Sequence, residues 1–190
     1  MYNDNHRPRG HGHGRGPRDD FDGRERRGVP LSELDPAITD VSRRVIGSAI
    51  DVHKTLGPGY PVEVYLKALC SELEQAGVRF TLGHRFAVKY KGKEVGHTQP
   101  CTFIDDRFLV EVMAVHKEIG YVERATLRAQ LRAGELQLGL IINFAERRLK
   151  DGLVRVLNPE KIASLREADH LGHDHADDGH DAPIDPDRPA

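Results

Sequence analysis

The residues best suited to metal chemistry gather around one short acidic stretch. Glu111 is the only acid within an apolar run that reads as a strand, and Asp105 and Asp106 precede that run. Hard carboxylate oxygens suit Mg²⁺, whereas Cys101 and His116, together with Glu111, would suit Zn²⁺. Each set has a plainer alternative: two consecutive aspartates favour a tight hairpin turn, and a buried cysteine acts as a small hydrophobe.

Two helices are expected before this stretch. Asp35-Pro36 is a helix-start signal, and apolar residues then recur at three- and four-residue spacing until Gly57. A second amphipathic run extends from Pro61 to Ala76 and ends at Gly77. The spacing therefore predicts two consecutive amphipathic helices.

Alternating residues then predict strands. Short strands are expected over 80–82, 86–90, 95–99, 102–104 and 108–115, as an antiparallel meander of three or four strands. Residues 125–133 have helix composition, and 138–144 and 153–157 read as further strands. The order predicts an α/β (α+β) fold, with helices packed on a mixed sheet.

Composition divides the chain into three parts. Residues 1–28 and 167–190 have almost nothing to bury, which predicts disordered tails around one domain at 29–166. The net charge of −2 hides a mildly basic centre, with 20 basic and 17 acidic residues, next to a C-terminal part with eight acids and one arginine. Two cysteines, with no signal segment or long apolar run, predict a cytoplasmic protein that does not insert in a membrane.

Three blocks give the sequence a family resemblance. They are the loop and helix start at 56–65, the hairpin at 103–115, and the strand at 138–144 with Arg155-Val-Leu-Asn158 after it. Between about Val41 and Leu157 the chain resembles the GxxExxY proteins of the PD-(D/E)xK nuclease superfamily. The resemblance implies a nuclease fold in which a helix glutamate, a strand aspartate and a Glu-x-Lys pair converge on Mg²⁺ beside a phosphate.

Position by position, the resemblance implies that most of this chemistry is missing. Glu111 matches the strand glutamate, but Cys101 replaces the aspartate and Met113 replaces the lysine. The helix glutamate falls on Val62 and a later glutamine on Thr126. Glu63 lies one position further along the helix, about 100° around its axis. It can substitute for Val62 only if the helix register shifts by one residue.

These losses favour a catalytically inactive nuclease-fold protein that acts as a binding, scaffolding or self-assembling module. Two alternatives stay open. The first is a Mg²⁺-dependent DNA or RNA endonuclease with a rearranged site of Glu63, Asp105 or Asp106, and Glu111. The second is a nucleic-acid-binding protein that does not cleave.

The tails add two weaker hypotheses. His11 and His13, and His173 and His175, would hold Zn²⁺, Ni²⁺ or Cu²⁺ loosely, or simply belong to solubilising segments. Basic residues that could contact nucleic-acid phosphates form two groups, one in the N-terminal tail and one on a loop, and solvated surfaces are the competing interpretation. The two groups are Arg7, Arg9 and Arg15, and Arg147, Arg148 and Lys150.

Overall fold

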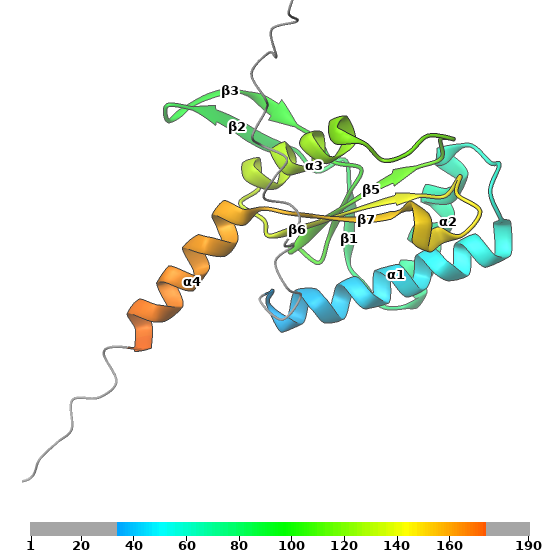
Figure 1. The fold of residues 1–190 in the computed structure, drawn as a ribbon, viewed down its shortest axis with the longest axis horizontal. Coiled ribbons are helices and arrows are strands. Elements are labelled where there is room, and N and C mark those ends of the chain that lie inside the picture. The colour runs from blue at the N-terminus through cyan, green and yellow to red at the C-terminus, as the bar shows by residue number, and fades with distance from the viewer. Residues whose placement is uncertain (1–33, 174–190) are drawn as a thin grey trace, which may run out of the picture.

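The structure is a computed structural model that describes residues 34–173. Helices cover both faces of a central sheet, and a separate two-stranded hairpin projects from one end (Figure 1). In chain order the helices and strands are α1 (Pro36–Leu56), α2 (Val62–Gln75), β1 (Phe80–Leu82), β2 (Phe86–Tyr90), β3 (Lys93–Thr98), β4 (Thr102–Ile104), β5 (Phe108–Met113), α3 (Tyr121–Ala133), β6 (Leu138–Asn143), β7 (Leu153–Leu157) and α4 (Pro159–His173). The expected α/β class is confirmed.

Helices α1 and α2 follow the expected apolar spacing. The Asp35 carboxylate accepts a hydrogen bond from the Ala37 N–H at 2.8 Å, which caps α1, and Pro36 occupies the first turn. Gly57 ends α1 in a left-handed conformation (φ 65°) that glycine adopts without strain. Their apolar faces pack on the sheet through residues such as Val45 and Tyr65.

The central sheet has the strand order β1-β4-β5-β6-β7. Neighbours are antiparallel except β5 and β6, which are parallel and connected through α3. Alternate residues of β5 face opposite layers: Phe108, Val110 and Val112 join the core beneath α1 and α2, while Leu109 and Met113 join the core beneath α3. Glu111 belongs by alternation to the α3 side.

The expected meander is wrong in one respect. Strands β2 and β3 pair only with each other, and β1 pairs directly with β4, so the hairpin is an insertion between two strands of the main sheet. Gly83, at φ 66°, turns the chain out of β1, and the ring of Phe86 packs against Phe103 at 5.3 Å between centroids. Alternating residues show that strands are present but not which strands pair.

Helix α4 was not expected from the sequence. Its start is favoured by Pro159 in the first turn, by Asn158 Oδ1 accepting from the Lys161 N–H at 3.4 Å, and by burial of Ile162. The helix continues to His173, so the prediction of a disordered tail from residue 167 is corrected for 167–173, while 174–190 and 1–28 lie outside the described residues. No helix between residues 34 and 173 is long and apolar enough to cross a membrane.

Candidate functional site

Glu111 and Cys101 lie opposite each other at one end of the β4–β5 pair. The register joins Thr102 with Val110, which brings the preceding Cys101 beside Glu111. The Cys101 N–H donates a hydrogen bond to Glu111 Oε2 at 3.2 Å. Burial raises the pKa of the Glu111 carboxyl, and this hydrogen bond acts in the opposite direction. One oxygen of the Glu111 carboxylate is therefore already hydrogen-bonded to the backbone of Cys101, the position to which the family resemblance assigns an aspartate.

Cys101 has the environment of a packing residue. Its side chain is partly buried against the core beneath α1 and α2, and the Thr102 hydroxyl donates to its sulfur at 3.7 Å. Burial is the main cause that raises the pKa of the Cys101 thiol, which opposes thiolate formation at neutral pH. His116 is exposed on the loop after β5, and no cluster of three metal-ligating side chains occurs among residues 34–173. The geometry therefore does not support the zinc site.

The remaining motif positions lack the acid, amide and lysine side chains that the family resemblance implies. Met113 packs against the core beneath α3, and Val62 against the core beneath α1 and α2. Thr126 is exposed on α3, and Glu63 is exposed on α2. Glu111 is thus the only carboxylate at the four positions that the resemblance assigns to the metal and lysine site, and a single carboxylate does not fit Mg²⁺, which prefers several oxygen ligands.

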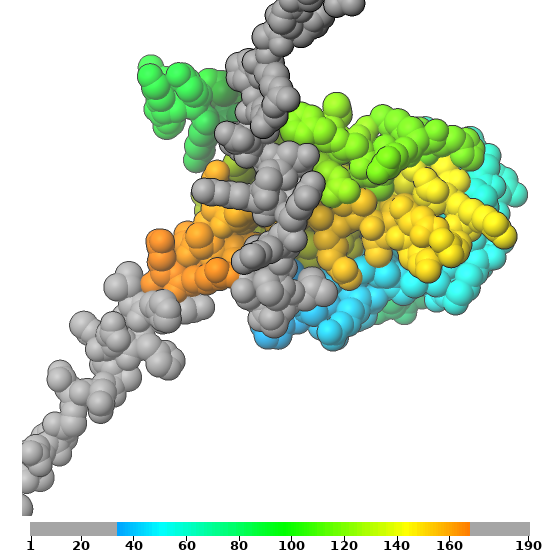
Figure 2. Space-filling view, in the orientation of Figure 1, coloured from blue at the N-terminus to red at the C-terminus, as the bar shows by residue number. Residues whose placement is uncertain are grey.

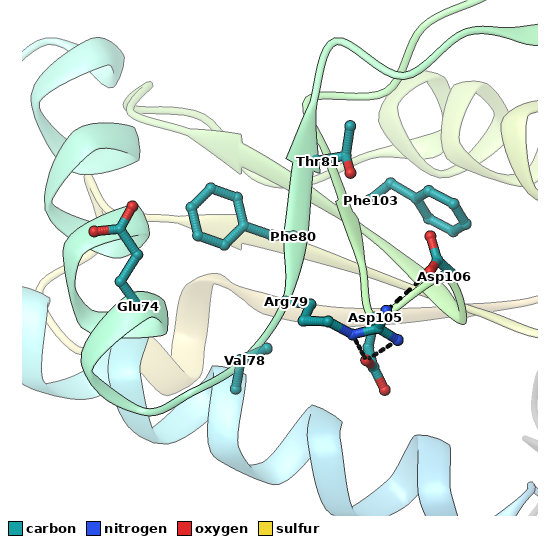
Figure 3. Close-up of a pocket in the computed structure, with 8 residues that line it drawn as sticks. All are labelled: Glu74, Val78, Arg79, Phe80, Thr81, Phe103, Asp105 and Asp106. Atoms are coloured by element: carbon teal, nitrogen blue, oxygen red, sulfur yellow. Dashed lines mark hydrogen bonds and ion pairs between the residues drawn. The ribbon is translucent and has the colours of Figure 1, made fainter.

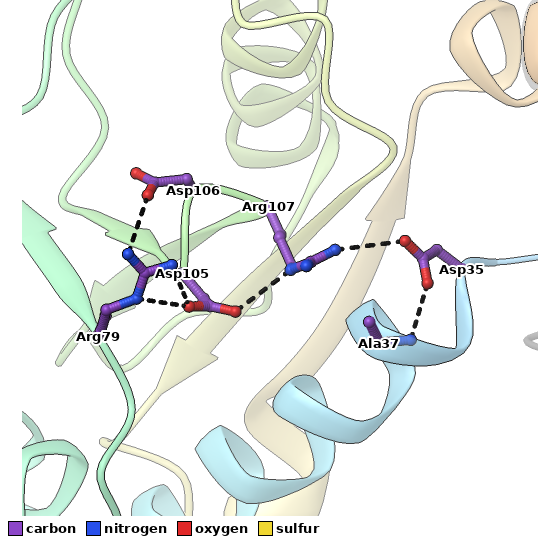
Figure 4. A network of polar contacts seen from close by, with 6 residues as sticks. All are labelled: Asp35, Ala37, Arg79, Asp105, Asp106 and Arg107. Carbon is purple, nitrogen blue, oxygen red and sulfur yellow. Dashed lines mark hydrogen bonds and ion pairs between the residues drawn. The ribbon is translucent and has the colours of Figure 1, made fainter.

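The two aspartates before β5 form a hairpin turn. Asp105 and Asp106 both have positive φ angles, 47° and 55°, as the two central residues of a type I′ turn require, and the Arg107 N–H closes this turn on the Ile104 carbonyl at 2.8 Å. Asp105 accepts from Arg79 at 2.8 Å and from Arg107 at 3.2 Å, Asp106 lies 3.7 Å from Arg79, and Arg107 lies 3.4 Å from Asp35 (Figure 4). These carboxylates are neutralised in an ion-pair network that ties the turn to α1.

A cavity of about 620 Å³ lies beside this turn rather than beside Glu111. It is formed by the end of α2, by β1 and by the β4–β5 turn, including Glu74, Phe80 and Phe103 (Figure 3). Its charged lining residues Arg79 and Asp105 already bond each other. Glu111 does not line it, so the cavity and the expected reaction centre are different places.

Tyr65 holds the glycine-rich loop between α1 and α2. Its side chain is fully buried, its hydroxyl donates to the Gly57 carbonyl at 2.6 Å, and it accepts from the Tyr60 N–H at 3.1 Å. Its ring stacks on Phe144 with centroids 4.7 Å apart. The loop motif that carries the family resemblance therefore has a structural function here.

Asn143 is a supporting residue to which sequence reasoning gave no role. Its fully buried amide donates to the Val115 and Lys117 carbonyls at 2.8 and 3.3 Å, and accepts from the Val115 and Ala145 N–H groups at 3.1 and 3.2 Å. These hydrogen bonds hold in place the loop that follows β5. An asparagine at the end of the apolar run 138–144 was the available signal, because a buried amide needs several partners.

The basic loop is only partly free to bind a partner. Arg147 and Lys150 are exposed, but Arg148 bonds Asp151 at 2.7 Å. His173 is the last residue of α4. The other tail positions proposed for metal or nucleic acid lie outside the part of the chain that the structure describes; they are Arg7, Arg9, Arg15, His11, His13 and His175.

Comparison with known families agrees with this architecture. Residues 39–156 match the family profile described as the PD-(D/E)XK nuclease superfamily, which spans well over half of the chain. The protein therefore belongs to the PD-(D/E)XK nuclease superfamily. No curated protein and no solved structure matches it significantly.

Proposed function

We propose that this protein is a GxxExxY-type member of the superfamily that does not cleave nucleic acid and serves as a binding or scaffolding module. The observation that carries the proposal is the environment of Glu111: the residue opposite it is Cys101 rather than an acid, and its Oε2 accepts from the Cys101 backbone N–H. Mg²⁺-dependent hydrolysis needs oxygen ligands that position the attacking water and offset charge on the phosphate. The residues around Glu111 supply one such side chain.

The endonuclease alternative requires the acids to regroup. Asp105 and Asp106 lie in the turn before β5, whereas Glu111 is the fourth residue of that strand. Glu111 therefore lies about 10 Å along the strand from Phe108, the first residue of β5. The two aspartates are also paired with arginines. Bringing them to Glu111 would break the turn, which favours the non-catalytic proposal.

A sheet edge supports self-association as the binding mode. Among residues 34–173, strand β1 pairs with β4 on one side only, and Leu82 at its end is 49% exposed. A free edge strand offers unpaired backbone groups to a second chain. A second copy that pairs along β1 would extend the five-stranded sheet.

Light scattering coupled to size exclusion tests this binding mode. We expect a defined oligomer that becomes monomeric in Leu82→Lys, because a charged edge opposes strand pairing. Val122→Lys, at a residue 69% exposed on α3, is the matched control and should leave the mass unchanged. A monomer at every concentration would refute self-association, while leaving the proposal of lost cleavage to be tested separately.

A further inference from the structure

The β2–β3 hairpin carries a group of positive charges that no ion pair within residues 34–173 neutralises. Residues 84–98, here called the basic hairpin, contain four basic residues and one acid; the basic residues are Arg85, Lys89, Lys91 and Lys93. The hairpin projects beyond the rest of the domain, visible in green in Figure 2. Its charges therefore face solvent rather than the core.

The lysines of the basic hairpin have no acidic partner within the described residues. Glu94, the only acid, pairs with His97 at 3.1 Å. Lys91 Nζ lies 5.5 Å from the centroid of the Tyr90 ring, and no carboxylate among residues 34–173 forms an ion pair with Lys89, Lys91 or Lys93. These ammonium groups are available to an anionic partner.

Strand geometry distributes the charge over both faces. Lys89 lies opposite Glu94 on one face, while Tyr90 lies opposite Lys93 on the other. The base of the hairpin is anchored, since Phe86 packs edge-on against Phe103. The basic hairpin thus holds its lysines in a defined place and suits an extended acidic chain that can contact both faces.

The chain itself contains such a segment. Residues 174–190 include six aspartates and one basic residue, Arg188. They follow α4, which leaves the domain at the same end as the basic hairpin (Figure 1). A 15-residue helix carries the chain roughly 22 Å, whereas 17 further residues span up to about 60 Å. The acidic segment is therefore long enough to reach back from the end of α4 to the basic hairpin.

We propose that the basic hairpin docks the acidic segment 174–190 of the same chain. Opposite charge favours the contact, and covalent connection raises the effective concentration of the segment near the hairpin. Other basic surfaces match it less well. Arg148 already bonds Asp151, and residues 1–28 carry five acids beside their seven arginines. The contact does not depend on whether the Glu111 site is catalytic.

Zero-length cross-linking of the full chain tests the contact directly. A carbodiimide joins a lysine amine to an adjacent carboxylate, and mass spectrometry identifies the joined peptides. We expect aspartates of 174–190 to link to Lys89, Lys91 and Lys93 about fivefold more than to the exposed Lys67 and Lys150, and 0.5 M salt to suppress these links. Mixing ¹⁴N- and ¹⁵N-labelled protein separates links within one chain from links between chains.

The proposal is overturned if the acidic segment links mainly to Lys67 or Lys150, or if about half of its links to the hairpin join differently labelled chains, as random pairing between chains gives in an equal mixture. Amide NMR shifts of the full chain provide a second measurement. Changing all six aspartates of 174–190 to asparagine should shift amides of residues 86–98, while Glu63→Gln with Glu118→Gln, at two exposed acids elsewhere, should not. Unchanged hairpin amides in the first variant would overturn the contact.

Discussion

Two neighbouring regions of the domain differ sharply in how their polar groups are used. Around Tyr65, Phe144 and Asn143, buried polar atoms have several partners each and hold the loops that follow α1 and β5. Around Glu111 a single carboxylate accepts from a backbone N–H, and the residue opposite it is a cysteine. The difference teaches that the residues that hold this fold in shape are separate from the residues around Glu111. In the function proposed above, the first set is complete and the second is not.

The largest expected effect is on the free energy of unfolding, which should fall more for a substitution in the first region than for one in the second. Asn143→Leu removes the partners of backbone groups at Val115, Lys117 and Ala145, so we expect a loss of about 3–5 kcal/mol in the free energy of unfolding. Met113→Leu, at the motif position on β5, conserves volume and should cost less than about 1.5 kcal/mol. Urea denaturation measures both. Equal losses of unfolding free energy in the two variants would show that the two regions do not differ in their contribution to stability.

A smaller effect is expected at the loop between α1 and α2. Tyr65→Phe keeps the stacked ring but loses the hydroxyl that bonds Gly57 and Tyr60, which should cost about 1–2 kcal/mol. Tyr60→Phe changes a half-exposed residue and should stay within about 0.5 kcal/mol. If urea denaturation gives the same value for both, the buried hydroxyl does not support the loop.

In the proposed function, adding a carboxylate opposite Glu111 should create a response to metal that the unsubstituted protein does not show. Cys101→Asp places a second acid opposite Glu111, and we expect Mn²⁺ to stabilise this variant by about 1 kcal/mol, a rise of a few degrees in Tm. The unsubstituted protein should show no rise. Stabilisation of the unsubstituted protein by Mn²⁺ that disappears in Glu111→Gln would instead show a functioning metal site.

The smallest effect concerns the pH dependence of Glu111. Its pKa is raised in the fold, so the folded protein binds more protons than the unfolded chain between the ordinary glutamate pKa and the raised value, and stability falls as pH increases through that window. Glu111→Gln removes this loss. We expect the variant to match the unsubstituted protein at pH 4 and to melt slightly higher at pH 7. A lower Tm at pH 7 would mean that the ionised carboxylate is stabilising.

Much of the fold could be predicted because its signals are local. Apolar spacing defined α1 and α2, and two consecutive aspartates correctly indicated the β4–β5 turn. The pairing of β1 with β4 across the inserted hairpin depends on contacts distant in sequence, such as Phe86 on Phe103. Helix α4 was missed because it begins directly after β7 and has a weak apolar stripe, with only Ile162 buried among its described side chains.

The candidate site was predictable in part for the same reason. Because β4 and β5 are joined by only three residues, 105–107, counting ten residues back from Glu111 identifies Cys101, and the register places the two side by side. The role of Asn143 depends on the loop at 115–117 folding back onto β6. This contact joins residues that are distant in sequence, so the spacing of residue types does not predict it.

Cleavage of nucleic acid is the most direct test of the central claim. Supercoiled plasmid and single-stranded RNA are incubated with the full chain at high concentration in Mg²⁺ or Mn²⁺, next to Glu111→Ala that has been shown to fold. We predict that both substrates stay intact with both proteins. Cleavage by the unsubstituted protein that disappears in Glu111→Ala would contradict the account and show that the superfamily reaction persists here.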